Sequence, residues 1–358
     1  MVISRSIRPE QLHGTELEVC ETILYDRLPD KRVRCTICQR RCVICEGKRG
    51  YCETRLNREG HLYSLIYGRV SAIMVSPIEK KPLFHYYPGS HWLSLGSLGC
   101  NFRCPGCQNW DIAHAKPEEG ERHIRYLAPG EVIQLAKDNE CMGISWTYNE
   151  PTLWFEYTLD CAKFAKEKGL KTNYVTNGFI TAEAMDLIGP YLDSFRVDIK
   201  GFSQGSYRRI AHLDSFEGIL EVAIRAQRKW GMHVEVISNL IPGWNDDMQQ
   251  LKDIAAWIRR SLGKSTPWHV TRFVPYLDLS HLPPTPVRVL ETAREIGLKE
   301  GLEYVYLGNV HGHPAENTYC PRCGNLLVRR NGFIVLRNDI ADGRCTQCGS
   351  PVWGTFDS

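Results

Sequence analysis

The chain has 358 residues, of which 43% are hydrophobic and 24% are charged, and its formal net charge is +3. This composition is typical of a globular protein, and no apolar run approaches the ~18 residues of a membrane helix, so we expect no membrane contact. The small net charge excludes a strongly basic nucleic-acid binder. The first ten residues lack the apolar core and cleavage site of a secretory signal, so we expect a cytoplasmic protein.

Cysteine is the compositional outlier, with 15 residues. An odd number of cysteines without a secretory signal argues against a disulfide scaffold and favours thiolate metal ligands in a reducing compartment. Most of them fall into three groups, which are Cys35, Cys38, Cys42, Cys45 and Cys52, then Cys100, Cys104 and Cys107, then Cys320, Cys323, Cys345 and Cys348. We therefore expect three metal-binding regions.

The first cysteine group lies in a predicted N-terminal cysteine-rich region, residues 1–90. Four thiolates suit either zinc or an auxiliary iron–sulfur cluster, and we favour zinc. Arginine and lysine residues are interleaved with these cysteines over residues 31–52. Such a segment can contact RNA or an acidic partner, but it more often forms a solvated face that offsets the negative thiolates. We do not expect nucleic-acid binding.

Between the second and third groups, short β-rich runs alternate with helical stretches, which predicts βα units around a parallel sheet. The predicted strands are 91–97, 142–147, 171–176, 194–199, 233–240, 269–274 and 304–307, and the predicted helices include 152–168, 216–229, 247–261 and 286–297. Six or seven units fit into residues 91–314, and eight would need more chain. We therefore predict an α/β fold, a partial (β/α)6-type barrel with functional residues at the carboxyl ends of its strands.

The second cysteine group carries the predicted chemistry. Three thiolates at C-x3-C-x2-C spacing can hold a [4Fe-4S] cluster on one loop and leave one iron open to a ligand such as S-adenosylmethionine (SAM). Cys38, Cys42 and Cys45 have the same spacing, but the Cys100 loop directly follows an apolar strand and precedes the other barrel strands. We therefore predict that Cys100, Cys104 and Cys107 are the catalytic set. The alternative is an ordinary zinc site with His114 as the fourth ligand.

The third cysteine group predicts a C-terminal zinc-ribbon-like domain, residues 315–358. Two C-x2-C pairs, Cys320 with Cys323 and Cys345 with Cys348, are separated by 21 residues that include a strand-like stretch. This pattern is typical of two knuckles that share one tetrahedral ion. We expect structural zinc, because a small domain without a large core gains folding free energy from its metal. A rubredoxin-like iron site is the alternative.

The Cys100 loop and four strand-end segments together resemble the radical SAM enzymes related to pyruvate formate-lyase activating enzyme. The segments are Tyr148-Asn149-Glu150-Pro151, Thr176-Asn177-Gly178, Asp198-Ile199-Lys200 and Ile241-Pro242-Gly243-Trp244-Asn245-Asp246. Within that group, the first cysteine segment and the stretches 79–85, 268–275 and 316–321 resemble the AmmeMemoRadiSam-system radical SAM enzyme. This closer resemblance implies that Cys35, Cys38, Cys42 and Cys52 bind the N-terminal metal and that Cys45 is additional.

The resemblance also implies a SAM site. Glu150 would bind the SAM amino group, although a glutamate before Pro151 could instead act as a helix N-terminal charge. Asn177 would contact the SAM carboxylate or ribose, and Asn239 is a weaker candidate. Asp198 and Lys200 alternate with Ile199 and therefore face one side of the sheet, either beside the SAM carboxylate or a cation or as a structural ion pair.

One position departs from the family pattern. Where the family has an aromatic residue that contacts adenine, this chain has Gly106, so another side chain must support the adenine. Phe102 and Trp110 are candidates, although either could serve in packing alone.

The predicted function is that of a radical SAM enzyme, an oxidoreductase in the broad sense, that cleaves SAM reductively and acts on an unidentified substrate. It would need a low-potential electron donor, and the resemblance implies Memo-like and AMMECR-domain proteins as associates. One alternative is a glycyl-radical-enzyme activase, which uses the same chemistry on a protein substrate. The other is a non-catalytic zinc or iron–sulfur module that binds RNA or protein.

Overall fold

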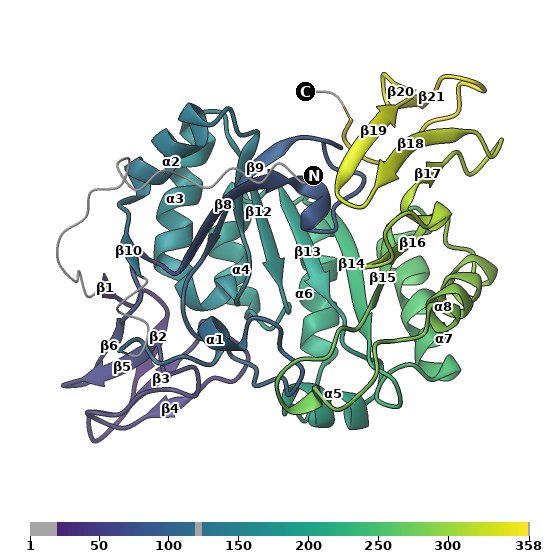
Figure 1. The fold of residues 1–358 in the computed structure, drawn as a ribbon. Coiled ribbons are helices and arrows are strands. Elements are labelled where there is room, and N and C mark those ends of the chain that lie inside the picture. Colours follow the sequence, from purple (N-terminus) through teal and green to yellow (C-terminus); the bar gives the residue numbers. More distant parts are fainter. Residues whose placement is uncertain (1–19, 119–123, 357–358) are drawn as a thin grey trace.

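The computed structural model describes residues 20–118 and 124–356, and an eight-stranded sheet forms its centre (Figure 1). Seven strands run parallel, and one antiparallel strand closes an edge. In spatial order the strands are β16 (Val305–Gly308), β15 (Trp268–Arg272), β14 (His233–Leu240), β13 (Ser194–Asp198), β12 (Lys171–Thr176), β11 (Gly143–Trp146), β9 (His91–Gly96) and β8 (Ala72–Pro77). This topology confirms the predicted α/β fold with a parallel, incomplete barrel.

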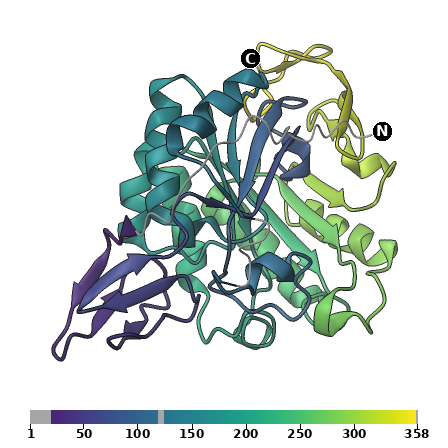
Figure 2. The ribbon, with the colours of Figure 1, turned by 60° about the vertical axis from the view of Figure 1, so that its left-hand side comes forward.

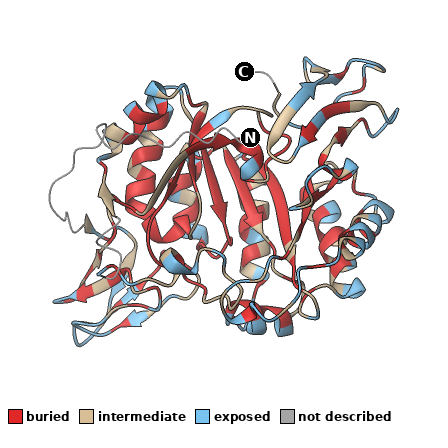
Figure 3. Ribbon diagram, in the orientation of Figure 1, coloured by how far each residue is buried: buried red, intermediate tan, exposed pale blue. Residues whose placement is uncertain are grey.

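The strands of this sheet are buried, and helices cover its outer face (Figure 3). These helices are α2 (Pro129–Asp138), α3 (Phe155–Glu167), α4 (Ala182–Ile188), α5 (Gln204–Ala211), α6 (Glu217–Arg228), α7 (Met248–Trp257) and α8 (Val287–Lys299). In α6 the buried residues Ile219, Val222, Ala223 and Ala226 recur at the helical period, which gives the helix one apolar face for the sheet. None of the described helices is long and apolar enough to cross a membrane.

The predicted elements agree with the observed ones where the pattern was regular. β12 and β14 have the predicted bounds, and the predicted helix 152–168 divides into a 3-10 turn, Pro151–Trp154, followed by α3. The helices α2, α4 and α5 and the strand β8 were not predicted from the sequence. Half of the residues of β8 are only partly buried, so its sequence has little strand periodicity.

A small N-terminal module, β1 to β7, packs against the barrel on the side where the strands end (Figure 2, purple). It contains two three-stranded sheets, formed by β1 (Cys20–Glu21), β6 (His61–Ser64) and β5 (Arg55–Arg58), and by β2 (Tyr25–Arg27), β3 (Val33–Cys35) and β4 (Val43–Ile44). β7 (Arg69–Val70) pairs with β10 (Arg125–Tyr126). The domain limits 1–90, 91–314 and 315–358 stay a prediction, and β8, from within the first range, is hydrogen-bonded to β9 of the sheet.

The C-terminal ribbon, β17 to β21, lies near the opposite, amino ends of the strands (Figure 1, yellow). It comprises β17 (Thr318–Tyr319), β18 (Leu326–Asn331), β19 (Ile334–Asn338), β20 (Ile340–Ala341) and β21 (Arg344–Cys345). Buried Arg330 donates to the carbonyl of Phe84 at 2.8 Å, and the buried carboxylate of Glu235 on β14 accepts from the backbone of Phe84 and His85 at 3.1 and 2.8 Å. These contacts hold the ribbon at that end, so the carboxyl ends of the strands remain for a site.

Candidate active site

Cys100, Cys104 and Cys107 lie on the loop between β9 and the short helix α1 (Trp110–Ala113) and line a cavity of about 400 Å³ inside the barrel. The loop is held by Arg103, whose guanidinium donates to the carbonyl of Cys100 at 2.9 Å and to that of Ala113 at 3.3 Å. The Phe102 N–H donates to the Cys100 sulfur at 3.4 Å. Three thiols are thus presented to one cavity at the carboxyl end of the first parallel strand.

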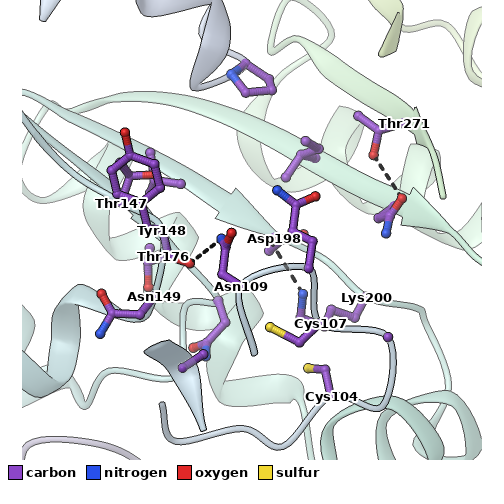
Figure 4. Close-up of a pocket in the computed structure, with 18 of the residues that line it drawn as sticks. Cys104, Cys107, Asn109, Thr147, Tyr148, Asn149, Thr176, Asp198, Lys200 and Thr271 are labelled. Atoms are coloured by element: carbon purple, nitrogen blue, oxygen red, sulfur yellow. Dashed lines mark hydrogen bonds and ion pairs between the residues drawn. The ribbon is translucent and has the colours of Figure 1, made fainter. Parts of the chain in front are cut away.

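The strand-end residues predicted to bind SAM line the same cavity. They are Glu150 after β11, Asn177 after β12, Asp198 and Lys200 on and after β13, and Asn239 on β14. In Figure 4 the Cys104 and Cys107 side chains lie beside the Asp198–Lys200 pair. The structure therefore brings the three cysteines and these five residues together, although they are up to 139 positions apart in the sequence, from Cys100 to Asn239.

Glu150 is a buried carboxylate with several hydrogen-bond donors around it. Its Oε1 accepts from the Thr152 N–H and hydroxyl at 3.0 and 2.6 Å and from the Thr176 hydroxyl at 2.7 Å, while Oε2 accepts from the Asn177 N–H at 2.8 Å. Burial raises the pKa of Glu150, and these donors oppose that shift. A carboxylate offers about four lone-pair sites, so Oε2 has room for one further donor from the cavity.

We expect Glu150→Gln to weaken SAM binding by about 10- to 150-fold, because a hydrogen bond to a charged group contributes about 1.5–3 kcal/mol. The amide keeps the size of the side chain but loses the negative charge that would attract the SAM ammonium. Equilibrium binding of SAM under anaerobic conditions measures the effect.

Methylthioadenosine, which lacks the amino acid part of SAM, is the control ligand for this variant. Its affinity should be the same in wild type and variant. Equal losses for both ligands would mean that the substitution distorts the cavity and that Glu150 does not act on the SAM amino group.

Asp198 forms the centre of a charged row along β13. Its Oδ2 lies 3.2 Å from Arg196 Nη1 and 3.5 Å from Lys200 Nζ. Burial disfavours the Asp198 carboxylate, but the two cations outweigh burial and lower its pKa. Burial raises the pKa of the Cys104 thiol to about 11, and the Lys200 ammonium opposes that rise. Lys200 therefore favours the thiolate form that a metal ligand requires.

Asn177 and Asn239 differ in the hydrogen bonds that their side chains form within the protein. The Asn177 side chain donates to Asn101 Oδ1 at 2.7 Å and accepts from the Phe179 N–H at 2.9 Å, so it connects the Cys100 loop to the loop after β12. The Asn239 amide oxygen accepts from the Thr271 hydroxyl at 3.4 Å. Asn239 lines the cavity near the carboxyl end of β14.

Gly106 lies close to two apolar side chains. A Cβ atom there would lie 3.0 Å from side-chain atoms of Leu279 and Phe273, so a larger residue at this position would require these side chains to shift. Phe102 is buried, lines the cavity and packs against Phe179 with ring centroids 5.5 Å apart. Trp110 is 47% exposed and is not among the cavity-lining residues, so of the two candidates only Phe102 faces the cavity.

Sequence reasoning missed several residues that line the cavity. Arg196 is two positions before Asp198 on the same face of β13, so the strand period could have identified it. Lys81 is buried, its ammonium donates to the Ser76 hydroxyl at 2.5 Å, and burial lowers its pKa to about 7. No local pattern marks Lys81, because only the folding of segment 78–87 across the barrel brings it to the cavity.

The C-terminal ribbon holds a compact cysteine site. The sulfurs of Cys320, Cys323, Cys345 and Cys348 all lie within 4.8 Å of one another, and Cys320 with Cys348 and Cys323 with Cys345 are 3.7 Å apart. Metal–sulfur bonds of ~2.3 Å in a tetrahedron give sulfur separations of about 3.8 Å. These four cysteines can therefore bind one metal ion, as predicted.

The sulfurs of the other two cysteine groups are spaced farther apart than those of the ribbon. Within residues 20–118 and 124–356, no further group of three histidine, cysteine or carboxylate ligand atoms lies within 4.8 Å of one another. Cys100, Cys104, Cys107 and His114 therefore lack the geometry of the ordinary zinc site considered as an alternative. Cys35, Cys38, Cys42 and Cys52 line a separate, smaller cavity in the N-terminal module, whereas Cys45 is exposed and does not line it.

We expect Cys345→Ser with Cys348→Ser to remove one metal ion per chain, because one knuckle supplies half of the tetrahedron. Iron that reconstitution adds at the Cys100 loop should stay, since the ribbon lies at the other end of the barrel. Metal analysis of the purified protein measures both. Loss of iron together with the ribbon ion would contradict the independence of the two sites.

The protein is thus an incomplete parallel barrel in which a loop with three cysteines lines a cavity at the carboxyl ends of the strands. The profile of the Radical SAM superfamily matches residues 95–256, which include this loop. The uncharacterised protein MJ0808 of Methanocaldococcus jannaschii is 42% identical over 334 residues, which cover 93% of this chain and 98% of that protein. The chain belongs to the Radical SAM superfamily, which implies a [4Fe-4S] cluster and SAM.

More distant similarities are confined to parts of the chain. A probable GTP 3',8-cyclase of Saccharolobus islandicus is 29% identical over 129 residues, which cover 34% of this chain and 38% of the cyclase. A radical SAM methyltransferase from Sphaerobacter thermophilus has a TM-score of 0.48 at 15% identity and covers 71% of this chain and 72% of its own. A domain of a pyruvate-formate lyase-activating enzyme from Bacteroides vulgatus has a TM-score of 0.38 at 19% identity and covers 47% of this chain and 99% of its own.

Proposed function

We propose that this protein is a radical SAM enzyme in which Cys100, Cys104 and Cys107 hold the [4Fe-4S] cluster and SAM occupies the adjoining cavity. One observation carries the proposal. The three thiols and the polar ends of four successive strands, β11 to β14, line a single cavity of about 400 Å³. The open spacing of these thiols also fits a cluster better than a single ion. When bound, the cluster supplies the electron that cleaves SAM reductively.

The chain's own residues bind and orient SAM. The free lone pair of Glu150 Oε2 accepts a hydrogen bond from the SAM ammonium, and Lys200 is available to its carboxylate. Asn177 fixes the loop after β12 against the Cys100 loop, so the two sides of the SAM site keep one geometry. Phe102 offers an apolar surface beside the cysteines, and the buried walls of the barrel exclude water.

The substrate would bind in the part of the cavity that Arg196, Asn239, Thr271 and Lys81 line. We further propose the AmmeMemoRadiSam subtype, with a low-potential electron donor and with Memo-like and AMMECR-domain proteins as associates, because the sequence segments typical of that system extend over nearly the whole chain. Within this proposal the ribbon ion is zinc and the location is cytoplasmic, as suits an oxygen-sensitive cluster in a reducing compartment.

Anaerobic reconstitution tests the proposal. We expect a reducible [4Fe-4S] cluster whose electron paramagnetic resonance signal shifts when SAM is added, and release of 5′-deoxyadenosine or another SAM fragment after reduction with dithionite. A wild-type protein that binds metal but shows neither the shift nor SAM cleavage would overturn the enzyme assignment in favour of a non-catalytic metal-binding module.

A further inference from the structure

The N-terminal cysteines differ in arrangement from the ribbon cysteines. In the ribbon, four sulfurs lie within 4.8 Å of one another, as one tetrahedral ion requires. No three of the sulfurs of Cys35, Cys38, Cys42 and Cys52 do so. In a [4Fe-4S] cluster each thiolate binds a different iron, so the cysteine sulfurs lie farther apart than around one ion. The N-terminal quartet, defined as these four cysteines, shares its open spacing with the Cys100 loop.

The quartet nevertheless converges on one closed space. All four side chains line a small cavity whose other walls include Ile37, Ile44 and Leu153. Cys35, Cys38 and Cys52 are buried and Cys42 is half-buried. Cys45 is three residues beyond Cys42 but is exposed and does not line the cavity. The fold therefore selects four of the five clustered cysteines and gives them an apolar shell.

The surroundings of the quartet offer a hydrogen-bond donor and two cations. The Thr54 hydroxyl donates to the Cys52 sulfur at 3.3 Å. The side chains of Arg40 and Arg55 also line the cavity. Hydrogen bonds to sulfur and nearby cations stabilise the more negative, reduced state of a cluster and so tune its potential.

The quartet adjoins the Cys100 loop through Asn101. This buried residue follows Cys100 in the chain, lines the quartet cavity, and accepts from Arg40 Nε at its carbonyl at 2.7 Å. Cys38 also forms a β-bridge with Ile180, and Gln39 donates to the carbonyl of Phe179 at 3.0 Å, in the loop that carries Asn177. Asn101 is therefore both a wall residue of the quartet cavity and the direct chain neighbour of Cys100, a ligand of the proposed catalytic cluster.

We propose that Cys35, Cys38, Cys42 and Cys52 hold a second iron–sulfur cluster that passes electrons one at a time to the cluster at the Cys100 loop, a role that rests on the proposed function. A reduced one-electron carrier of the flavodoxin or ferredoxin class is oxidised as the quartet cluster is reduced. The quartet cluster is then reoxidised as the catalytic cluster gains the same electron. No bond of the protein changes in either step.

Mössbauer spectroscopy and iron, sulfide and zinc analysis of the anaerobic wild-type protein test the metal assignment without any variant. We expect two cluster environments and one zinc ion per chain. Cys42→Ala should lose one cluster's share of iron and sulfide and keep the SAM-responsive signal, while the matched control Cys45→Ala should keep both clusters. A wild type with one cluster and two zinc ions would overturn the inference and leave the proposed function intact.

The relay is tested by freeze-quench spectroscopy with two reductants. We expect reduced flavodoxin to reduce the catalytic cluster of wild type and of Cys45→Ala, and to fail with Cys42→Ala, whereas dithionite should reduce all three. Equal rates with flavodoxin in all three proteins would overturn the relay. A protein without any SAM-responsive cluster would instead overturn the proposed function, so the two failures are distinct.

Discussion

Replacing Cys100, Cys104 and Cys107 with alanine is expected to abolish SAM cleavage completely and to remove the cluster signal that responds to SAM. The three thiols belong to one loop and line one cavity, so without them nothing attaches a cluster beside Glu150 and Lys200. Cofactor chemistry of this kind is lost with the cofactor rather than reduced in proportion. Electron paramagnetic resonance with and without SAM, together with product analysis, measures the effect.

The matched control for the triple variant is the second C-x3-C-x2-C segment, Cys38, Cys42 and Cys45. Alanine at these three positions should leave a SAM-responsive cluster when dithionite is the reductant. If the SAM response persisted in the Cys100 loop variant and vanished in the control, the catalytic cysteines would be those of the N-terminal module, and our assignment of the two loops would be reversed.

We expect Glu156→Gln to lower the free energy of unfolding by about 3–5 kcal/mol, because it leaves a buried arginine without its counter-charge. Arg55 of β5 and Glu156 of α3 have side chains that are 2% and 3% exposed, and their charged atoms are 2.8 Å apart. The same guanidinium donates to the Leu153 carbonyl at 2.9 Å, so it joins the N-terminal module to the barrel. Urea titration under anaerobic conditions measures the loss.

The control for this substitution is an exposed ion pair that crosses the same interface. Arg41 and Glu183 are 2.6 Å apart, with side chains 42% and 52% exposed, and Glu183 lies on α4. Exposed pairs contribute about 0–1 kcal/mol because water solvates either partner when it is alone. Glu183→Gln should therefore change stability little, and equal effects of the two substitutions would show that burial does not determine the contribution of the Arg55 pair.

The site was predictable where its residues follow a local rule. Asp198 and Lys200 were placed on one face by strand alternation, and both face the cavity. The cysteine spacing likewise marked the Cys100 loop and the ribbon. The same strand alternation also predicts that Arg196, two residues before Asp198, lies on this face of β13. Trp110 was considered as a cavity residue, but it lies on the exposed side of α1.

The positions of Lys81 and Asn101 could not be predicted from any local sequence pattern. Lys81 is buried at the cavity because segment 78–87 crosses the barrel, and Asn101 connects the quartet to the Cys100 loop because the N-terminal module packs beside it. β8 was also missed, since its partner β9 and not its own composition makes it a strand. Contacts of this kind depend on segments far apart in the sequence.

The parallel α/β fold, the three cysteine groups and the polar residues at the strand ends could all be predicted from the sequence, because periodicity and ligand spacing are properties of short segments. The close grouping of the ribbon sulfurs, the wider spacing of the quartet and the exposure of Cys45 became apparent only from the three-dimensional fold. Distances between side chains depend on how whole elements pack. Packing also brought the quartet beside the Cys100 loop, and the proposed path for electrons depends on that contact.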